Sequence, residues 1–315
     1  MKMANVRNFM RKTFKFGLFI PLSNLILTYG SRCLPDNLLR RISDRRNRKI
    51  RKIVLRITKY DGSQHCSPDD ASLAGGQEKV WFFWMQGESN MPSVPRLCLR
   101  YLRKNAAGHP IIVLTKDNIK EYANIPGRIY ELWDKGIITT THFSDILRFA
   151  LLSQQGGFWI DATMLVIRPL GNDIFDKPLF TVRTRPFGHF VSRCRWTGFC
   201  IASRKGGELA TKAYGLLVDY WTNTDVQVDY FLIDHVLNIL YETVSAIRKE
   251  IDEIPYSNEH MHGLNRLLCD DFDAWRYDEL TADGTYMFKL SWKTYTEEQL
   301  RSNPRSYYNY LLKNL

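Results

Sequence analysis

The stretch Ser144-Asp145-Ile146-Leu147-Arg148, followed by Gly156-Gly157-Phe158-Trp159-Ile160-Asp161-Ala162-Thr163, decides the expected fold. It predicts a helix over 144–155 that Ser144 or Thr141 could cap, a stop at the glycine pair, and an apolar strand ending in a carboxylate. This order brings Asp145, Arg148 and Asp161 to one crevice at the carboxyl edge of a sheet, where α/β proteins bind ligands. Two carboxylates and a guanidinium there suit a polyhydroxylated ligand that carries phosphate.

Apolar runs on both sides of this stretch predict a mixed, mostly parallel α/β sheet flanked by helices. The order strand, helix, strand between residues 79 and 115 indicates a parallel pair. Strands are expected at 79–85, 109–115, 158–161, 164–167, 178–183 and 198–203, and helices at 94–105, 117–122, 126–135, 209–220, 229–244 and from 297. The chain therefore reads as one Rossmann-like unit with additions.

The positive charge of the chain is concentrated at its start. The 315 residues carry a net charge of +11, but residues 1–60 hold 16 Lys and Arg against two acids, whereas the remainder holds 28 against 31. We therefore expect a basic, mainly helical, amphipathic arm at 1–60, a linker at 61–77 and a near-neutral domain at 78–315. A solvated helix face is the simplest alternative for the arm.

An apolar run at residues 17–29 adds a second signal to the arm. It is shorter than the roughly 20 apolar residues that span a bilayer, and no cleavage site typical of a signal peptide follows it. Basic residues beside an apolar segment favour an anionic membrane surface as partner. No zinc, helix-turn-helix or RNA-binding signature accompanies the charge, so nucleic acid is not an expected partner. Six scattered cysteines without paired spacing suggest reduced thiols in a cytosolic protein.

The candidate site residues also allow ordinary structural interpretations. Asp145 and Arg148 are three residues apart and could form a surface ion pair on a helix. Asp161 could bond its own backbone in a turn, or it could hold a divalent cation that carries a diphosphate. Asp229 could be a helix N-cap, and the same ambiguity applies to Asp234 and His235.

The segment from Val80 to about Lys293 resembles the capsular polysaccharide synthesis proteins, relatives of the DXD-motif sugar transferases. The SD-x-x-R and GG-x-W-x-D core carries the likeness, and further matching pieces keep the same order along the chain. These pieces are Trp84–Gly87, Asn90–Pro92, Trp196–Phe199, Asp229–His235 and Lys289–Lys293.

The resemblance implies a GT-A-like glycosyltransferase that moves a sugar from a nucleotide diphosphate donor, expected to be UDP-linked, with retention of configuration. The acceptor would be a surface polysaccharide or a lipid-linked glycan precursor at the inner face of the plasma membrane. Donor-binding residues would be Trp84, Gln86, Ser144, Asp145, Arg148, Asp161, Thr163, Lys289 and Lys293. Trp196 and His235 would contact the acceptor, and Asp161, Asp229 and Asp234 would be the catalytic candidates.

The same resemblance implies Mn²⁺ or Mg²⁺ at Asp161 and Thr163. Thr163 stands where the DXD motif has its second aspartate, which is usually the direct metal ligand. One carboxylate and a hydroxyl make a poor cation site unless the diphosphate supplies the remaining charge. A non-catalytic, membrane-docked scaffold that binds a nucleotide sugar is therefore the alternative function.

Overall fold

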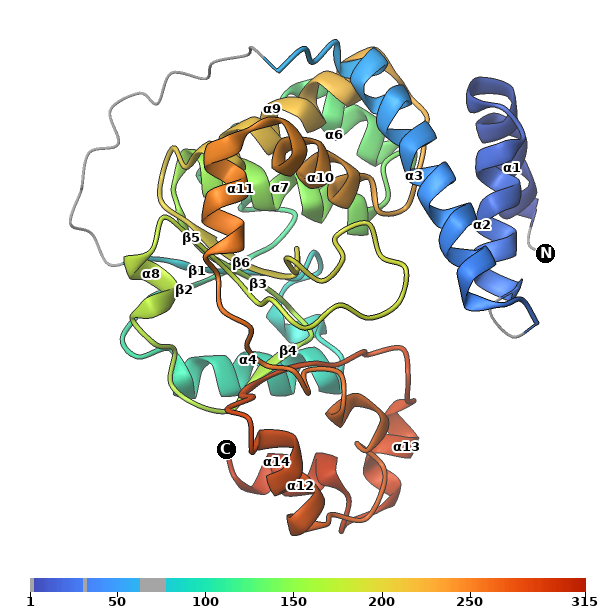
Figure 1. Cartoon of the computed structure of the whole chain (residues 1–315). Helices are drawn as coiled ribbons and strands as arrows, with labels where there is room; N and C mark the ends of the chain where they lie inside the picture. The colour runs from blue at the N-terminus through green and yellow to red at the C-terminus, as the bar shows by residue number, and fades with distance from the viewer. Residues whose placement is uncertain (1–2, 31–32, 63–77) are drawn as a thin grey trace.

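The computed structural model describes residues 3–30, 33–62 and 78–315 (Figure 1). The helices are α1 Met3–Phe16, α2 Phe19–Tyr29, α3 Asp36–Thr58, α4 Ser93–Asn105, α5 Ile119–Tyr122, α6 Gly127–Asp134, α7 Thr140–Gln154, α8 Asp173–Asp176, α9 Glu208–Asn223, α10 Leu232–Thr243, α11 Ser245–Asp252, α12 Ala274–Thr281, α13 Glu297–Ser302 and α14 Tyr307–Lys313. The strands are β1 Val80–Phe83, β2 Ile111–Leu114, β3 Gly157–Asp161, β4 Met164–Val166, β5 Leu179–Thr181, β6 Cys200–Ser203 and β7 Met287–Lys289.

The central sheet has the strand order β2-β1-β3-β6-β5. Strands β2, β1 and β3 are parallel, β6 is antiparallel to β3, and β5 is antiparallel to β6. The predicted mixed, mostly parallel sheet flanked by helices is therefore confirmed. A separate two-stranded ladder pairs β4 with β7.

Alternating side chains of the strands enter two cores, as the period of two in a strand requires. Trp81 and Trp159 point into the larger core, which α7, α9 and α10 cover on one face of the sheet (Figure 1). Phe82 and Phe158 point into the core on the other face. Because both faces are covered, the strands read as continuous apolar runs.

Gly156 and Gly157 end α7 and start β3 with positive φ angles of 72° and 96°. A Cβ on Gly157 would lie 2.4 Å from the carbonyl oxygen of Lys79, so only glycine fits between β3 and the chain before β1. The predicted stop at the glycine pair is confirmed. The predicted caps are wrong, because Thr139 caps α7 by accepting a hydrogen bond from the His142 backbone N–H.

Helix α3 packs against α9 and α10 and contributes Ile50, Ile53 and Val54 to the larger core. Its Arg40, Arg41, Arg45, Arg48 and Lys52 are exposed. The predicted division into arm, linker and domain stays a prediction, and residues 63–77 of the linker lie outside the described residues. Within the described ranges, no helix combines the length and apolar character needed to cross a membrane.

Candidate active site

Two of the predicted donor-binding residues meet at the carboxyl edge of the sheet. Strands β1 and β3 pair in parallel with Phe83 opposite Asp161, so Trp84, the residue after β1, lies at the same edge as Asp161. The Asp161 side chain is 28% exposed, which leaves it accessible to a ligand. The edge therefore has the position that ligand sites of α/β sheets occupy.

The ladder of β4 and β7 brings Lys289 to the same place. Lys289 pairs with Met164, three residues after Asp161, and its backbone N–H donates to the Met261 carbonyl at 2.8 Å. Its Nζ donates to Asp161 Oδ2 at 2.8 Å. The two residues are 128 positions apart, so no local sequence pattern predicts this pair. Only the family resemblance predicted that both residues bind the donor.

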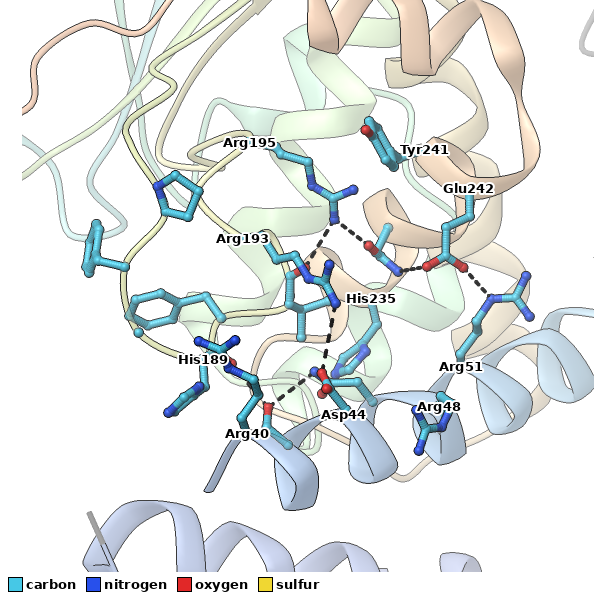
Figure 2. Close-up of a pocket in the computed structure, with 18 residues that line it drawn as sticks. Arg40, Asp44, Arg48, Arg51, His189, Arg193, Arg195, His235, Tyr241 and Glu242 are labelled. Atoms are coloured by element: carbon cyan, nitrogen blue, oxygen red, sulfur yellow. Dashed lines mark hydrogen bonds and ion pairs between the residues drawn. The ribbon is translucent and has the colours of Figure 1, made fainter. Parts of the chain in front are cut away.

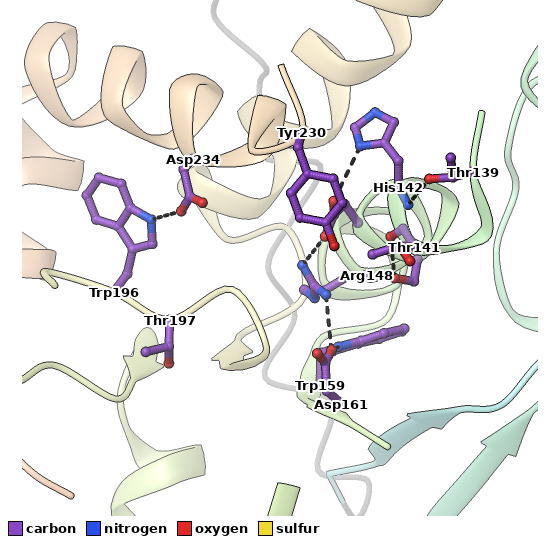
Figure 3. A network of polar contacts seen from close by, with 12 residues as sticks. Thr139, Thr141, His142, Arg148, Trp159, Asp161, Trp196, Thr197, Tyr230 and Asp234 are labelled. Carbon is purple, nitrogen blue, oxygen red and sulfur yellow. Dashed lines mark hydrogen bonds and ion pairs between the residues drawn. The ribbon is translucent and has the colours of Figure 1, made fainter. Parts of the chain in front are cut away.

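Helix α7 supplies the guanidinium that joins the two predicted carboxylates (Figure 3). Arg148 Nη1 donates to Asp145 Oδ1 at 2.8 Å, and Nη2 donates to Asp161 Oδ1 at 3.2 Å. The Arg148 side chain is only 4% exposed, so the alternative of a surface ion pair does not hold. The planar fork of Arg148 fixes the spacing of the carboxylates, which a single ammonium could not do.

His142 orients Asp145 from within the same helix. Its Nε2 accepts from the indole Nε1–H of Trp221 at 2.8 Å, and its Nδ1 lies 3.3 Å from Asp145 Oδ2. An indole nitrogen only donates, so His142 Nε2 carries no proton and Nδ1–H donates to Asp145. No role was predicted for His142, although its three-residue spacing from Asp145 on a helix is a signal that could have indicated one.

The electrostatics of the network keep Asp161 ionised. Burial alone would raise its pKa, but the charges of Lys289 and Arg148 overcome that effect and hold the pKa below its ordinary value. Trp159 Nε1–H also donates to Asp161 Oδ1 at 2.9 Å. Two carboxylates and two cations thus form one connected group with no formal net charge.

The residues predicted to hold a metal have protein partners in this arrangement. Both oxygens of Asp161 accept hydrogen bonds from protein donors: Arg148 and Trp159 bind Oδ1, and Lys289 binds Oδ2. Thr163 offers a neutral hydroxyl, and its carbonyl accepts from the Leu290 N–H. Among the described residues no group of three His, Cys, Asp or Glu side chains could hold a metal ion.

Asp234 and Tyr230 face this network from the start of α10 (Figure 3). Asp234 Oδ1 accepts from Trp196 Nε1 at 2.9 Å. Burial, and to a lesser degree the charge of Asp145, raise the pKa of Asp234 to about 6, against the opposing effects of Trp196 and Arg148. A carboxylate with that pKa can accept a proton near neutral pH.

Asp229, just before α10, and His235, within α10, are buried where α10 packs against α3, and their predicted catalytic and acceptor roles stay predictions. Asp229 is 1% exposed and pairs with Arg46 of α3, while its Oδ1 accepts from the Phe231 backbone N–H at 2.7 Å. It is not the N-cap of α10, which is Phe231. His235 is 2% exposed, and burial together with the nearby Arg46 charge lowers its pKa to about 3. Both residues contribute to the contact between α3 and α10.

The remaining predicted residues lie around the sheet edge with less contact. Ser144 Oγ donates to the Thr141 carbonyl of its own helix at 2.6 Å, and Gln86 is exposed in the turn after β1. Trp84 meets Trp292 edge to face, with 5.8 Å between the ring centroids. Lys293 is exposed, with its Nζ 5.2 Å from the Trp292 ring centroid.

A cavity of about 970 Å³ opens beside the network. Lys289, Asp234 and Trp196 line one part of it, and Leu27 and Leu39 of α2 and α3 line another. Its volume falls in the range of sites that enclose small molecules. The N-terminal helices therefore form a wall of the same cavity as the predicted donor residues.

A second cavity of about 880 Å³ lies between α3, α10 and the loop of residues 186–195 (Figure 2). Five arginines line it, together with Asp44 and Glu242. These arginines are Arg40, Arg48, Arg51, Arg193 and Arg195. The two cavities share Ser43 and the loop residues Phe187, His189, Phe190 and Val191, so they adjoin. No sequence signal joins α3 to this loop.

The fold and this edge define an α/β protein with a polar side-chain network and an adjoining cavity at the carboxyl end of its parallel strands. The chain belongs to the family of capsular polysaccharide synthesis proteins, whose family model matches residues 33–311. The predicted family is therefore confirmed, and the match includes α3.

Two similar proteins carry glycosyltransferase names. The chain is 23% identical over 253 residues to the O-glycosyltransferase PaGT of Phomopsis amygdali, which is 71% of this chain and 60% of that protein. The chain thus spans less than two thirds of that relative. The solved structure of PaToxG Glycosyltransferase matches 85% of this chain and 96% of its own, with 14% identity and a TM-score of 0.37.

Proposed function

We propose that this protein is a glycosyltransferase that moves a sugar from a nucleotide diphosphate donor, with UDP-sugars as the expected donors. The observation that carries the proposal is the connected group of Asp145, Arg148, Asp161 and Lys289 beside a cavity at the sheet edge. Carboxylates suit sugar hydroxyls, and cations suit phosphate oxygens. Family membership and the names of the similar proteins agree with this activity.

The donor would lie with its base near Trp84 and Trp292, where aromatic stacking is favourable. Arg148 and Asp145 would orient the sugar, and Lys289 would stabilise the negative charge that develops on the leaving diphosphate. Asp234 would accept the proton of the attacking hydroxyl, because it lines the cavity and has a raised pKa. Transfer with retention of configuration belongs to this proposal and rests on the family resemblance alone. Without a covalent intermediate, retention requires the hydroxyl to attack from the same face of the sugar that the diphosphate leaves.

The acceptor in this proposal is a lipid-linked glycan precursor that carries phosphate. The arginine-lined cavity adjoins the donor cavity and offers several guanidinium groups to an anionic acceptor. Arg48 and Arg193 line this cavity, and both side chains are largely exposed. Replacing both by alanine should raise the KM for a diphosphate-linked acceptor and leave the KM for the donor unchanged. Equal effects on both substrates would contradict this assignment.

The enzyme would work at an anionic membrane surface. Large apolar side chains of α1, of α2 and of the turn between them are exposed, and within each helix they recur at intervals of three or four residues, which places them along helix faces. These residues are Met10, Phe14, Leu18, Leu22, Leu25 and Tyr29. The exposed basic residues of α3 complement anionic lipid, at about 1 kcal/mol for each residue near the surface.

Liposome flotation tests the membrane proposal without disturbing the core. Phe14 is 97% exposed and Leu22 45%, so Phe14→Glu with Leu22→Glu should preserve the fold. We expect the wild type to float with vesicles that contain phosphatidylserine, and the double variant to stay in solution. Equal flotation of both would exclude α1 and α2 as the docking surface.

Thermal stability against a panel of nucleotide sugars tests the donor proposal. A ligand at 100 times its Kd adds about 2.7 kcal/mol to the free energy of unfolding. We expect one donor to stabilise the wild type and to have no effect on Asp161→Ala. Binding without turnover would favour a non-catalytic scaffold, and the absence of any shift would contradict the proposed function.

A further inference from the structure

We propose that the nucleoside diphosphate binds to this site without a divalent cation, because the ammonium group of Lys289 takes the place of the metal between Asp161 and the phosphates. This inference rests on the proposed function and specifies how the same site neutralises its ligand. It differs from the expectation drawn from the DXD relatives, in which Asp161 would bind Mn²⁺ or Mg²⁺.

The first support is that Asp161 has no oxygen free of a protein partner. Lys289 binds Oδ2 at 2.8 Å, while Arg148 and Trp159 bind Oδ1 at 3.2 and 2.9 Å. A metal at Asp161 would have to bind an oxygen that already accepts a hydrogen bond, and at Oδ2 it would lie beside the positive charge of the Lys289 ammonium. The backbone of Lys289 is held by its β7 pairing with Met164 and by its N–H bond to Met261.

The second support is the charge balance. Asp145 and Asp161 are formally matched by Arg148 and Lys289, all linked by hydrogen bonds. A divalent cation added to this group would lie beside the positive charges of Arg148 and Lys289. No carboxylate of the group would be left over to balance its charge. A diphosphate instead needs hydrogen-bond donors, and Lys289 can donate its remaining N–H groups to phosphate oxygens while both ion pairs stay intact.

The third support is that the second DXD position offers no charge. Thr163 carries a hydroxyl, and its backbone carbonyl is occupied by the Leu290 N–H. Hard cations such as Mg²⁺ are usually bound by one or two carboxylates in addition to phosphate oxygens. Here the one carboxylate at the motif is shared by Lys289, Arg148 and Trp159.

Lys289 also has donors left for a ligand. An ammonium has three N–H groups, and Asp161 accepts from one of them. Lys289 lines the cavity, with its Nζ 4.5 Å from the centroid of the Phe199 ring. His262 lines the same cavity, and burial and the Lys289 charge lower its pKa, so Lys289 supplies the positive charge on that side.

Calorimetric titration of UDP into the full chain tests this inference. It is carried out once with EDTA and once with Mn²⁺, on the wild type, Lys289→Ala and Lys249→Ala. Lys249 lies on α11 with its side chain 78% exposed, so its variant controls for the loss of one positive charge. We expect wild type and Lys249→Ala to bind equally well in EDTA and Mn²⁺. Lys289→Ala should bind roughly tenfold more weakly or worse in EDTA, the loss of one charge-assisted hydrogen bond.

Electron paramagnetic resonance of free Mn²⁺ tests the inference on the wild type alone, because the signal of the free ion falls when a protein binds it. We expect the wild-type protein without nucleotide to leave the Mn²⁺ signal unchanged. Binding of UDP only in the presence of Mn²⁺, or uptake of Mn²⁺ by the protein alone, would overturn the inference and leave the proposed function standing. The absence of binding by any nucleoside diphosphate in either condition would overturn both.

Discussion

Two pairs of an aspartate and an arginine have opposite surroundings. Asp161 and Arg148 lie at the edge of the sheet, where the Asp161 side chain is 28% exposed and Lys289 extends the pair into a cavity. Asp229 and Arg46 join α10 to α3 with side chains 2% and 9% exposed. Both aspartates were candidates for catalysis, and the difference in access separates a ligand site from a structural contact.

The buried pair should respond most strongly to mutation. Arg46→Met leaves the Asp229 carboxylate buried without its cation, so the free energy of unfolding should fall by about 3–5 kcal/mol. Urea denaturation measures this loss. Adding Asp229→Asn to Arg46→Met should recover part of it, because the unpaired charge is removed. If Arg46→Met alone were as stable as the wild type, the pair would not stabilise the packing of α3 against the domain.

The pair at the sheet edge should affect turnover more than stability. Arg148→Lys keeps the charge but cannot bind Asp145 and Asp161 together, since an ammonium lacks the planar fork. We expect kcat/KM for the donor to fall by roughly a hundredfold, the effect of about 2–3 kcal/mol. Steady-state kinetics at saturating acceptor provides the value. A variant with nearly unchanged kcat/KM would mean that the bridge does not position the donor.

The titration of Asp234 should make the stability of the protein depend on pH. Its folded-state pKa of about 6 lies above the ordinary 3.8, so the folded protein holds its proton over a range where the unfolded chain releases it. The contribution of Asp234 to stability is therefore fully present below about pH 4 and is lost as the pH rises through about 6.

Unfolding of wild type and Asp234→Asn between pH 4 and pH 7 isolates this contribution. The stability of the wild type relative to the variant should fall with rising pH across this window. The same variant should also lose the acidic limb of the pH profile of kcat, if Asp234 is the base. Parallel stability curves would show that Asp234 titrates as it does in the unfolded chain.

His142 should have a smaller effect because it acts through Asp145. His142→Leu removes the hydrogen bond to Asp145, and we expect turnover to drop by roughly fivefold, in line with about 1 kcal/mol for one hydrogen bond. His142→Asn can place an amide donor near the lost Nδ1–H and should restore part of the rate. If both variants lose the same activity, His142 serves packing and not the orientation of Asp145.

Ser144 is expected to contribute least. Its hydroxyl donates to Thr141 within α7, so Ser144→Ala should change donor affinity and stability by less than about 0.5 kcal/mol. Donor titration and thermal unfolding measure the two quantities. A large loss of donor affinity would show that Ser144 binds the donor, as the resemblance predicted.

Local patterns were enough to predict the core of the fold. The glycine pair, the apolar strand before Asp161 and the three-residue spacing of Asp145 and Arg148 depend on short-range geometry, and each matches the structure in its main features. The parallel order of β1 and β2 also follows from the helix between them.

Long-range contacts were outside the reach of the sequence. The pairing of Arg46 with Asp229, which buries a catalytic candidate against α3, joins positions far apart in the sequence with no local signal. The bond from Trp221 to His142 spans 79 residues, and the arginine-lined cavity forms only when α3 meets the 186–195 loop. The resemblance also suggested a metal at Asp161, but no local pattern indicates that this carboxylate accepts hydrogen bonds from both Arg148 and Lys289.

The most direct test of the account is release of nucleoside diphosphate from a panel of nucleotide sugars by the wild type, Asp161→Asn and Asp229→Asn. The account predicts that the wild type turns over one donor and that Asp161→Asn is inactive while it unfolds at about the wild-type temperature. Asp229→Asn should be less stable but active at low temperature. An active Asp161→Asn, or a folded but inactive Asp229→Asn, would contradict the assignment of the site to the sheet edge.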